Sequence, residues 1–315
     1  MLAIFATVLP VFLLIGTGYL AVRSGYLPLS MSDGLNAFAI KLAVPVLLFS
    51  AMVKLDFAQA FSPLLLVSFY TGAVVCFVSG ILLALKVFGR RPGEAVAVGF
   101  AATFSNSVLL GLAVVERFYT DPVLTSAFGI IAFHAPSIYI MGMLTMEMMR
   151  RDGKPLSQTL KTAGKSIMAN PLMIGILAGV AVNLSGLTLP EPVMAAVKLI
   201  AGAAIPVALV GVGAAMTNYQ LRAGMAESLT VSALSLILHP LIAFVLSHYV
   251  FGLPADMVRA AVTLAAMPPG MNIYVFAVMY QRAVNLAASA FLMATTLSVL
   301  TISLWLYMLS HLLFE

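Results

Sequence analysis

Two polar clusters interrupt otherwise apolar stretches of this 315-residue chain. The first is Ser105-Asn106-Ser107, and the second is Pro268-Pro269-Gly270 followed by Asn272. Serine and asparagine favour helix caps over helix interiors, proline has no amide hydrogen, and glycine adds backbone freedom, so both clusters predict helix breaks. The amides freed at such breaks, together with the two asparagine side chains, suit a carboxylate, and the freed carbonyls suit a cation.

Three further ionisable residues lie deep in apolar stretches, where such residues are candidates for function. Lys41 lies about nine residues into its apolar stretch, which corresponds to about 14 Å along a helix. We expect it to share a helix face with Pro45 and to supply positive charge to a bound anion. The alternative is that Lys41 snorkels to the interface. His134 and His239 each suit proton coupling or a hydrogen bond to a carbonyl equally well.

The composition requires a membrane. Of the residues, 62% are apolar and 9% are charged, and the mean hydropathy is +1.09, which excludes a soluble enzyme, a nucleic-acid binder and a disordered scaffold. The histidines are far apart and the chain shows no paired carboxylates, no metal-binding cluster and no Ser/His/Asp set, so we expect neither an enzyme nor a resident metal or cofactor.

We expect an all-α integral membrane protein with ten transmembrane helices. Pro- and Gly-containing turns separate the segments 2–22, 32–53, 59–87, 93–116, 122–149, 165–187, 192–217, 227–251, 256–280 and 285–312. Eleven of the sixteen Lys and Arg residues fall in the odd-numbered loops. This bias predicts that those loops are cytoplasmic and that both termini lie outside, with the first helix retained rather than cleaved.

The two halves of the chain resemble each other. At an offset of 161, Pro10 matches Pro171 and Gly18 matches Gly179, and the stretch around Pro45 matches that around Pro206. The repeat units are 1–149 and 165–315, joined by a basic cytoplasmic linker at 150–164. Because five helices is an odd number, the second copy enters from the opposite side, as in the inverted repeats of many secondary transporters. The breaks in the fourth and ninth helices then fall at equivalent positions, although the fourth has no proline.

The run from Pro268 to Ala277, followed by Tyr280, resembles the ninth helix of the auxin efflux carrier family, which includes bacterial malate and malonate permeases. Ser105-Asn106-Ser107 with Gly111-Leu112 is similar to the family's fourth helix, and the likeness extends over essentially the whole chain. The resemblance implies a scaffold of helices 1, 2, 6 and 7, a mobile transport domain of helices 3, 4, 5, 8, 9 and 10, and a homodimer through helices 2 and 7. It also implies that helices 4 and 9 cross at their breaks and bind substrate there. The implied site residues are Ser105, Asn106, Ser107, Pro268, Pro269, Gly270, Asn272 and Tyr274.

Together these features predict a prokaryotic inner-membrane secondary transporter that carries small organic anions, in particular carboxylates, by alternating access. Uniport and coupling to H⁺ or Na⁺ both stay open, with His134 and His239 as the candidates for a coupling role. A Na⁺-coupled organic-solute symporter is the alternative, and a channel is a weaker one because broken helices also line pores. The expected partners are the anion, membrane lipid and a second copy of the chain, without nucleic acid.

Overall fold

The computed structural model describes residues 2–57, 61–150, 161, 164–165, 168–218 and 224–312. The regular structure of this part of the chain is all helical, joined by turns and loops, and contains no strand beyond one isolated bridge. Within the described residues, six helices are long and apolar enough to cross a membrane, and shorter apolar helices accompany them. The protein is therefore a multi-pass membrane protein, because several of its helices have the length and apolar composition that a membrane span requires.

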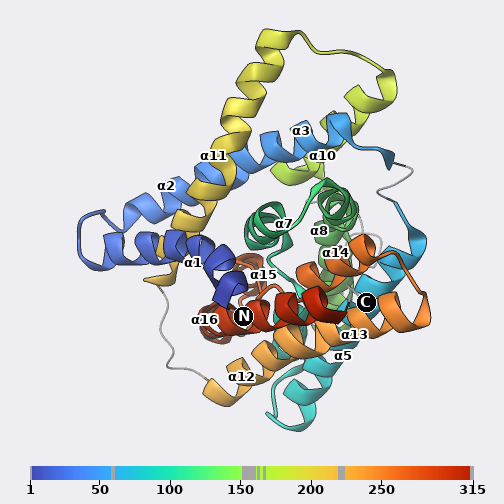
Figure 1. Ribbon diagram of the computed structural model, residues 1–315. Helices are drawn as coiled ribbons and strands as arrows, with labels where there is room; N and C mark the ends of the chain where they lie inside the picture. The colour runs from blue at the N-terminus through green and yellow to red at the C-terminus, as the bar shows by residue number, and fades with distance from the viewer. Residues whose placement is uncertain are drawn as a thin grey trace.

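One group of helices, here called the panel, lies along one side of the molecule (Figure 1). It consists of α1 (Leu2–Arg23), α2 (Ser30–Phe38), the π-helix η1 (Ala39–Ala43), α3 (Val44–Lys54), α10 (Pro171–Ser185) and α11 (Glu191–Met216).

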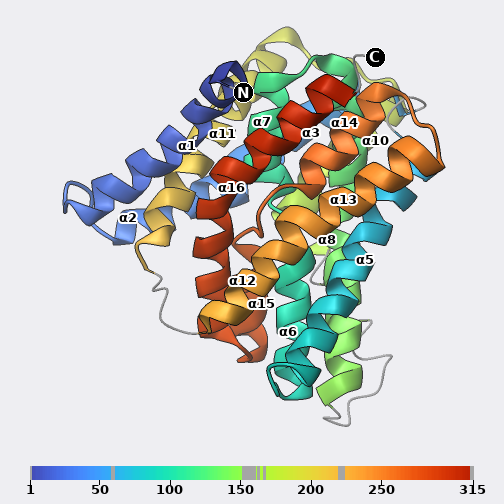
Figure 2. The ribbon, with the colours of Figure 1, turned by 60° about the horizontal axis from the view of Figure 1, so that its bottom comes forward.

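The remaining helices form a second group, here called the bundle. Its first half consists of α5 (Pro63–Lys86), α6 (Pro92–Thr103), the π-helix η2 (Ser107–Gly111), α7 (Leu112–Phe118) and α8 (Asp121–Arg150). Its second half consists of α12 (Met225–Ala233), the π-helix η3 (Leu234–Leu238), α13 (His239–Phe244), the π-helix η4 (Val245–Val250), α14 (Ala255–Ala265), α15 (Asn272–Tyr280) and α16 (Val284–Leu312). Both chain ends lie at one end of the molecule, and the turn from α5 to α6 lies at the other (Figure 2).

Glycines allow the panel helices to pack backbone to backbone. A Cβ atom on Gly18 of α1 would overlap the carbonyl oxygen of Val210 in α11, and one on Gly179 of α10 would lie 2.6 Å from the carbonyl oxygen of Phe49 in α3. Small residues of this kind hold helices together where lipid supplies no hydrophobic force between them. Asn183 of α10 adds a polar tie, because its amide donates to the carbonyls of Met52, Val53 and Leu55 at the end of α3.

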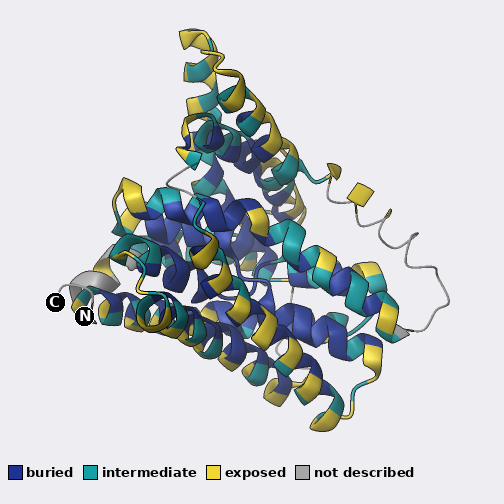
Figure 3. Ribbon diagram, turned by 90° about the vertical axis from the view of Figure 1, so that its right-hand side faces the viewer, coloured by how far each residue is buried: buried dark blue, intermediate teal, exposed yellow. Residues whose placement is uncertain are grey.

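The bundle has most of the buried interior (Figure 3), and exposed apolar side chains lie on helices of both the panel and the bundle. At the far end of the bundle, Arg90 in the turn after α5 binds Glu227 in the first turn of α12, with Nη2 and Oε2 2.8 Å apart. The hydrogen bond to Glu227 raises the pKa of the Arg90 guanidinium. This ion pair ties the α5–α6 turn to the start of α12.

The helices begin and end within a few residues of the expected segments over most of the chain. The largest difference is at 165–187, where the continuous helix α10 begins only at Pro171, one residue after its cap Asn170. The expected linker 150–164 lies mostly outside the described residues. The break in the fourth segment is real despite its lack of proline, since α6 ends at Thr103 and η2 begins at Ser107.

Candidate functional site

The two broken helices cross and pair through their backbones. Ser105 and Pro269 form an antiparallel bridge. The Asn106 amide donates to the Pro268 carbonyl at 2.8 Å, and the Gly270 amide donates to the Phe104 carbonyl at 3.1 Å. Unpaired backbone groups in the interior of a membrane protein cost several kcal/mol each, so these two bonds explain how both breaks are tolerated at one place.

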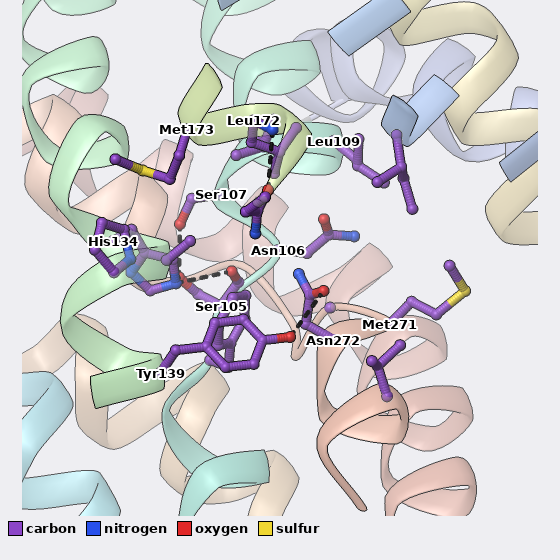
Figure 4. Close-up of a pocket in the computed structure, with 18 of the residues that line it drawn as sticks. Ser105, Asn106, Ser107, Leu109, His134, Tyr139, Leu172, Met173, Met271 and Asn272 are labelled. Carbon is purple, nitrogen blue, oxygen red and sulfur yellow. Dashed lines mark hydrogen bonds between the residues drawn. The ribbon is translucent and has the colours of Figure 1, made fainter. Parts of the chain in front are cut away.

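A cavity of about 350 Å³ lies against this crossing. Its polar lining comes from the break residues Ser105, Asn106, Ser107 and Asn272, from His134 and Tyr139 of α8, and from Asn170 at the start of α10 (Figure 4). The rest of the lining is mostly apolar, and it includes Ile40 and Met173 of the panel and Met143 and Met279 of the bundle. The cavity therefore separates the panel from the bundle at the level of the breaks.

Three asparagine amides face this cavity. The Tyr139 hydroxyl donates to Oδ1 of Asn272 at 3.3 Å, which leaves the amide nitrogen of Asn272 as a donor for a ligand. Oδ1 of Asn170 accepts the Leu172 amide at 2.9 Å and caps α10, which again leaves the amide nitrogen. Asn106 precedes η2, and its carbonyl accepts the amides of Leu110 and Gly111. The arrangement presents donors to one small volume, as the binding of an anion requires.

The two serines of the first break bind each other, and Ser105 also contacts His134. Their hydroxyl oxygens are 2.7 Å apart. Nε2 of His134 lies 3.1 Å from the Ser105 carbonyl oxygen and 3.5 Å from its hydroxyl oxygen. His134 is only 2% exposed, and its second ring nitrogen, Nδ1, is buried without a hydrogen-bond partner among the described residues.

The two histidines are closer than their separation in the sequence suggests. Both imidazoles pack on the ring of Phe69, with centroids 5.6 Å away for His134 and 4.8 Å away for His239. His239 lies behind that ring, and its Nε2 is 3.1 Å from the Phe69 carbonyl oxygen. The expectation that the two histidines lie far apart is therefore wrong. Of the two, only His134 lines the cavity.

Lys41 is exposed and does not line the cavity, whereas its neighbour Ile40 does. Pro45 is buried, so the two residues do not share a face. The reason is local: Lys41 lies in the π-helix η1, whose wider turns do not keep the α-helical register of about 3.6 residues per turn. Pro268, Pro269 and Tyr274 also lie off the cavity lining, and the two prolines contribute through the crossing of the backbones.

Sequence reasoning missed Asn170 and Tyr139. The signal for Asn170 was present, because Asn-Pro before an apolar run is a helix start, and Pro171 is the repeat partner of Pro10. Tyr139 had no local signal, since its role depends on where α8 passes α15.

The lining of the cavity carries no formal charge. Among the described residues that line it, none is Asp, Glu, Lys or Arg, and His134 is its one imidazole. A bound anion would therefore be held by amides, hydroxyls and helix N-termini, not by an ion pair.

Panel and bundle pack together on one side of the crossing and part on the other. Val44, Leu48 and Met52 of the panel share a buried cluster with Leu112 and Val115 of α7. Val11, Ile15 and Leu209 of the panel share another with Leu110, Val114, Met267, Ile302 and Leu306. The third large cluster, built from the other halves of the bundle helices, has Val212 as its one fully buried panel member among the described residues.

Comparison with known proteins places the whole chain among membrane transporters. Residues 3–306 match the family model described as "Membrane transport protein". An "Uncharacterized transporter" of Methanothermobacter thermautotrophicus is 29% identical over 310 residues, covering 95% of this chain and 96% of its own. A Rhizobium meliloti protein named "Putative malonate transporter" is 26% identical over 312 residues, covering 98% and 97%. The cavity at the crossing of two broken helices thus lies in a membrane transporter, and the chain belongs to the auxin efflux carrier family.

Proposed function

We propose that this protein is a secondary transporter that moves small organic anions, specifically carboxylates, across a prokaryotic inner membrane by alternating access. The observation that carries the proposal is the convergence of three asparagine amides on one cavity beside the backbone crossing. Amide donors and helix N-termini at mid-helix breaks are the features with which transporters bind the carboxylate of a substrate.

The distribution of buried clusters supports alternating access. The cavity lining extends from the breaks toward Met143 and Met279, which lie toward the ends of α8 and α15 beside the basic odd-numbered loops. The shared apolar clusters lie on the opposite side. We interpret the structure as an inward-facing state, in which the outer contact between panel and bundle is closed and the inner one is parted.

Matching contacts support the two inverted five-helix repeats. The contact of Gly18 with Val210 corresponds, at the offset of 161, to the contact of Gly179 with Phe49. Two copies of one shape packed in this reciprocal way can exchange conformations, which gives the inward-facing and outward-facing states. In this proposal the panel is the scaffold, the bundle is the transport domain, and the chain crosses the membrane ten times, with helices 4 and 9 broken.

The anion is favoured over Na⁺ as the principal ligand of the breaks. The carbonyls of Phe104 and Pro268, which a sodium ion would need, already accept hydrogen bonds from Gly270 and Asn106. The malonate in the name of the Rhizobium meliloti relative agrees with a carboxylate substrate. Lys41 does not belong to the proposed binding set, because it is exposed.

We place the basic loops in the cytoplasm and both termini outside, following the distribution of Lys and Arg. We also propose a homodimer through the helices 30–54 and 191–216. The exposed apolar side chains of these helices, such as Leu42 and Leu199, support a face that is covered by lipid or by a second copy. A mass of one chain in native lipid would contradict the dimer.

Uptake into proteoliposomes tests the function. Purified protein should take up radiolabelled malonate or a monocarboxylate with saturation, and unlabelled substrate inside should drive counterflow. Saturable uptake without counterflow contradicts alternating access, non-saturating flux indicates a channel, and the absence of any carboxylate flux contradicts the proposal as a whole.

A further inference from the structure

The cavity presents a problem for any substrate with two negative charges. While His134 is neutral, none of the described residues in the cavity lining carries a formal positive charge, and Lys41 does not line the cavity. Neutral donors can hold one carboxylate, but a second carboxylate in the same small volume adds charge repulsion and desolvation that hydrogen bonds alone offset poorly. To carry such a substrate, the protein therefore needs a positive charge that forms when the substrate binds and is lost when the substrate leaves.

His134 is the group in the lining that can supply it. Its Nε2 faces the Ser105 carbonyl oxygen, which can only accept a hydrogen bond, so the neutral ring carries its hydrogen on Nε2. The lone pair is then on Nδ1, which is buried and has no partner among the described residues. A buried acceptor without a donor is costly and rare, and a proton is the smallest species that can bind there.

The surroundings of His134 contain no competing charge within the described residues. Tyr70 of α5 stacks near the ring but donates its hydroxyl hydrogen to Ile130, and Tyr139 of α8 donates to Asn272. His239 of α13 lies behind the ring of Phe69. The charged residues of the neighbouring helices α6, α7 and α14 lie toward the ends of those helices; they are Glu94, Glu116, Arg117, Asp256 and Arg259.

We propose that His134 is the proton-binding residue that lets this transporter carry dicarboxylates, each with one proton. This inference rests on the proposed function. One carboxylate binds the asparagine amides, a proton from the side of entry binds Nδ1 of His134, and the imidazolium compensates the second carboxylate. The dianion and the proton cross together with a net charge of −1, and both leave on the other side, which returns His134 to its neutral form. A monocarboxylate needs no such proton and crosses with the same net charge.

The test compares malonate with a monocarboxylate in proteoliposomes at a pH where malonate is a dianion. Membrane potential is clamped with potassium and valinomycin, and a pH dye and radiolabel measure protons and substrate moved. Wild-type protein should move one proton and a charge of −1 per malonate, with uptake rising as the pH falls, and should move no proton with the monocarboxylate. This measurement needs no variant. Malonate that moves without a proton would overturn the proposal.

His134→Gln keeps a donor for the Ser105 carbonyl but cannot be protonated. A thermal unfolding midpoint close to that of the wild type shows that the variant folds. It should lose proton movement and weaken malonate uptake at least about tenfold more than monocarboxylate uptake. His239→Gln is the matched control and should keep proton-coupled malonate uptake. Normal proton coupling in His134→Gln, or its loss only in His239→Gln, would overturn the assignment. If the wild type moves neither acid, the proposed function falls together with this inference, whereas monocarboxylate uptake with uncoupled malonate removes only the inference.

Discussion

In the proposed function, asparagine is the residue on which recognition of the substrate in this cavity depends. A carboxylate needs donors, and Asn106, Asn170 and Asn272 provide them without adding a permanent charge that would have to be desolvated when the cavity is empty. Tyr139 fixes one of them, because its hydroxyl occupies the oxygen of Asn272. The contribution of each amide can therefore be separated by substitution.

Replacing Asn106 or Asn272 with Ala should weaken carboxylate uptake about tenfold to a hundredfold, because a hydrogen bond to a charged group contributes about 1.5–3 kcal/mol. Tyr139→Phe should have a smaller effect in the same direction, since the Asn272 amide then loses its orientation but stays in place. The apparent affinity for carboxylate, obtained from initial uptake rates, measures the effect of all three substitutions. Asn285→Ala, at an exposed position of α16, is the control. Unchanged affinity in both asparagine variants would place the site elsewhere.

Asn170 has two roles that one substitution can separate. Asn170→Ser retains an oxygen that can cap α10, as Ser does at many helix starts, but removes the amide donor to the cavity. We expect a thermal unfolding midpoint close to that of the wild type with carboxylate affinity lowered about tenfold. Asn170→Ala should lose both the cap and the affinity. A serine variant that binds carboxylate normally would show that Asn170 serves only as a cap.

At the scale of elements, the panel is held by close backbone approaches and the site by broken helices. Gly18 and Gly179 allow the panel helices to pack closely, and the bridge between Ser105 and Pro269 joins the two broken helices of the bundle. These two kinds of contact tolerate substitution differently. The two glycines admit no larger residue, whereas the bridge is formed by backbone atoms and tolerates changes of side chain.

Gly18→Ala should lower the stability of the panel, because its methyl group would overlap the Val210 carbonyl. Overpacking of this kind costs about 1–3 kcal/mol. Gly16→Ala is a matched control on the same helix, since a Cβ there meets nothing within 4 Å. Thermal unfolding in detergent distinguishes the two, and equal midpoints would contradict the close contact between α1 and α11.

Much at this scale could be predicted from the sequence. Continuous apolar runs located the helices, and the composition of the clusters at Ser105 and Pro268 located both breaks, since these depend on local chemistry. The face of Lys41 could not be predicted, because the π-helical turn at Ala39–Ala43 changes the register. The approach of Tyr139 to Asn272, and of both histidines to Phe69, depends on how distant helices pack, which no local pattern reports.

For the whole molecule, the important feature is the asymmetry between the two sides of the crossing. Apolar clusters shared by panel and bundle lie on one side, and the cavity lies on the other. In the proposed cycle the shared clusters must separate while the cavity closes. The two faces should therefore differ in their reactivity toward reagents that cannot cross the membrane.

Met279→Cys, on the exposed part of the cavity lining, should react with an impermeant maleimide added from the side of the basic loops. Bound carboxylate should slow this reaction. Val115→Cys, within the shared cluster, should be protected from both sides in the absence of substrate and become reactive from the other side during transport. The native Cys76 is buried, so the unsubstituted chain is the unlabelled control. Reaction of Val115→Cys at rest would contradict the inward-facing interpretation.

The crossing of the two breaks has a consequence for how this protein can diversify. Its two hydrogen bonds join main-chain atoms of Phe104, Asn106, Pro268 and Gly270, so they do not depend on the side chains at Ser105 or Asn106. Even a methyl group on Gly270 would meet Asn106 at ordinary contact distance, 3.4 Å. Mutations that change the side chains lining the cavity can therefore accumulate without breaking the backbone hydrogen bonds at the crossing. A lineage could in this way acquire a new nutrient or export a new waste product by changing a few side chains on an inherited frame.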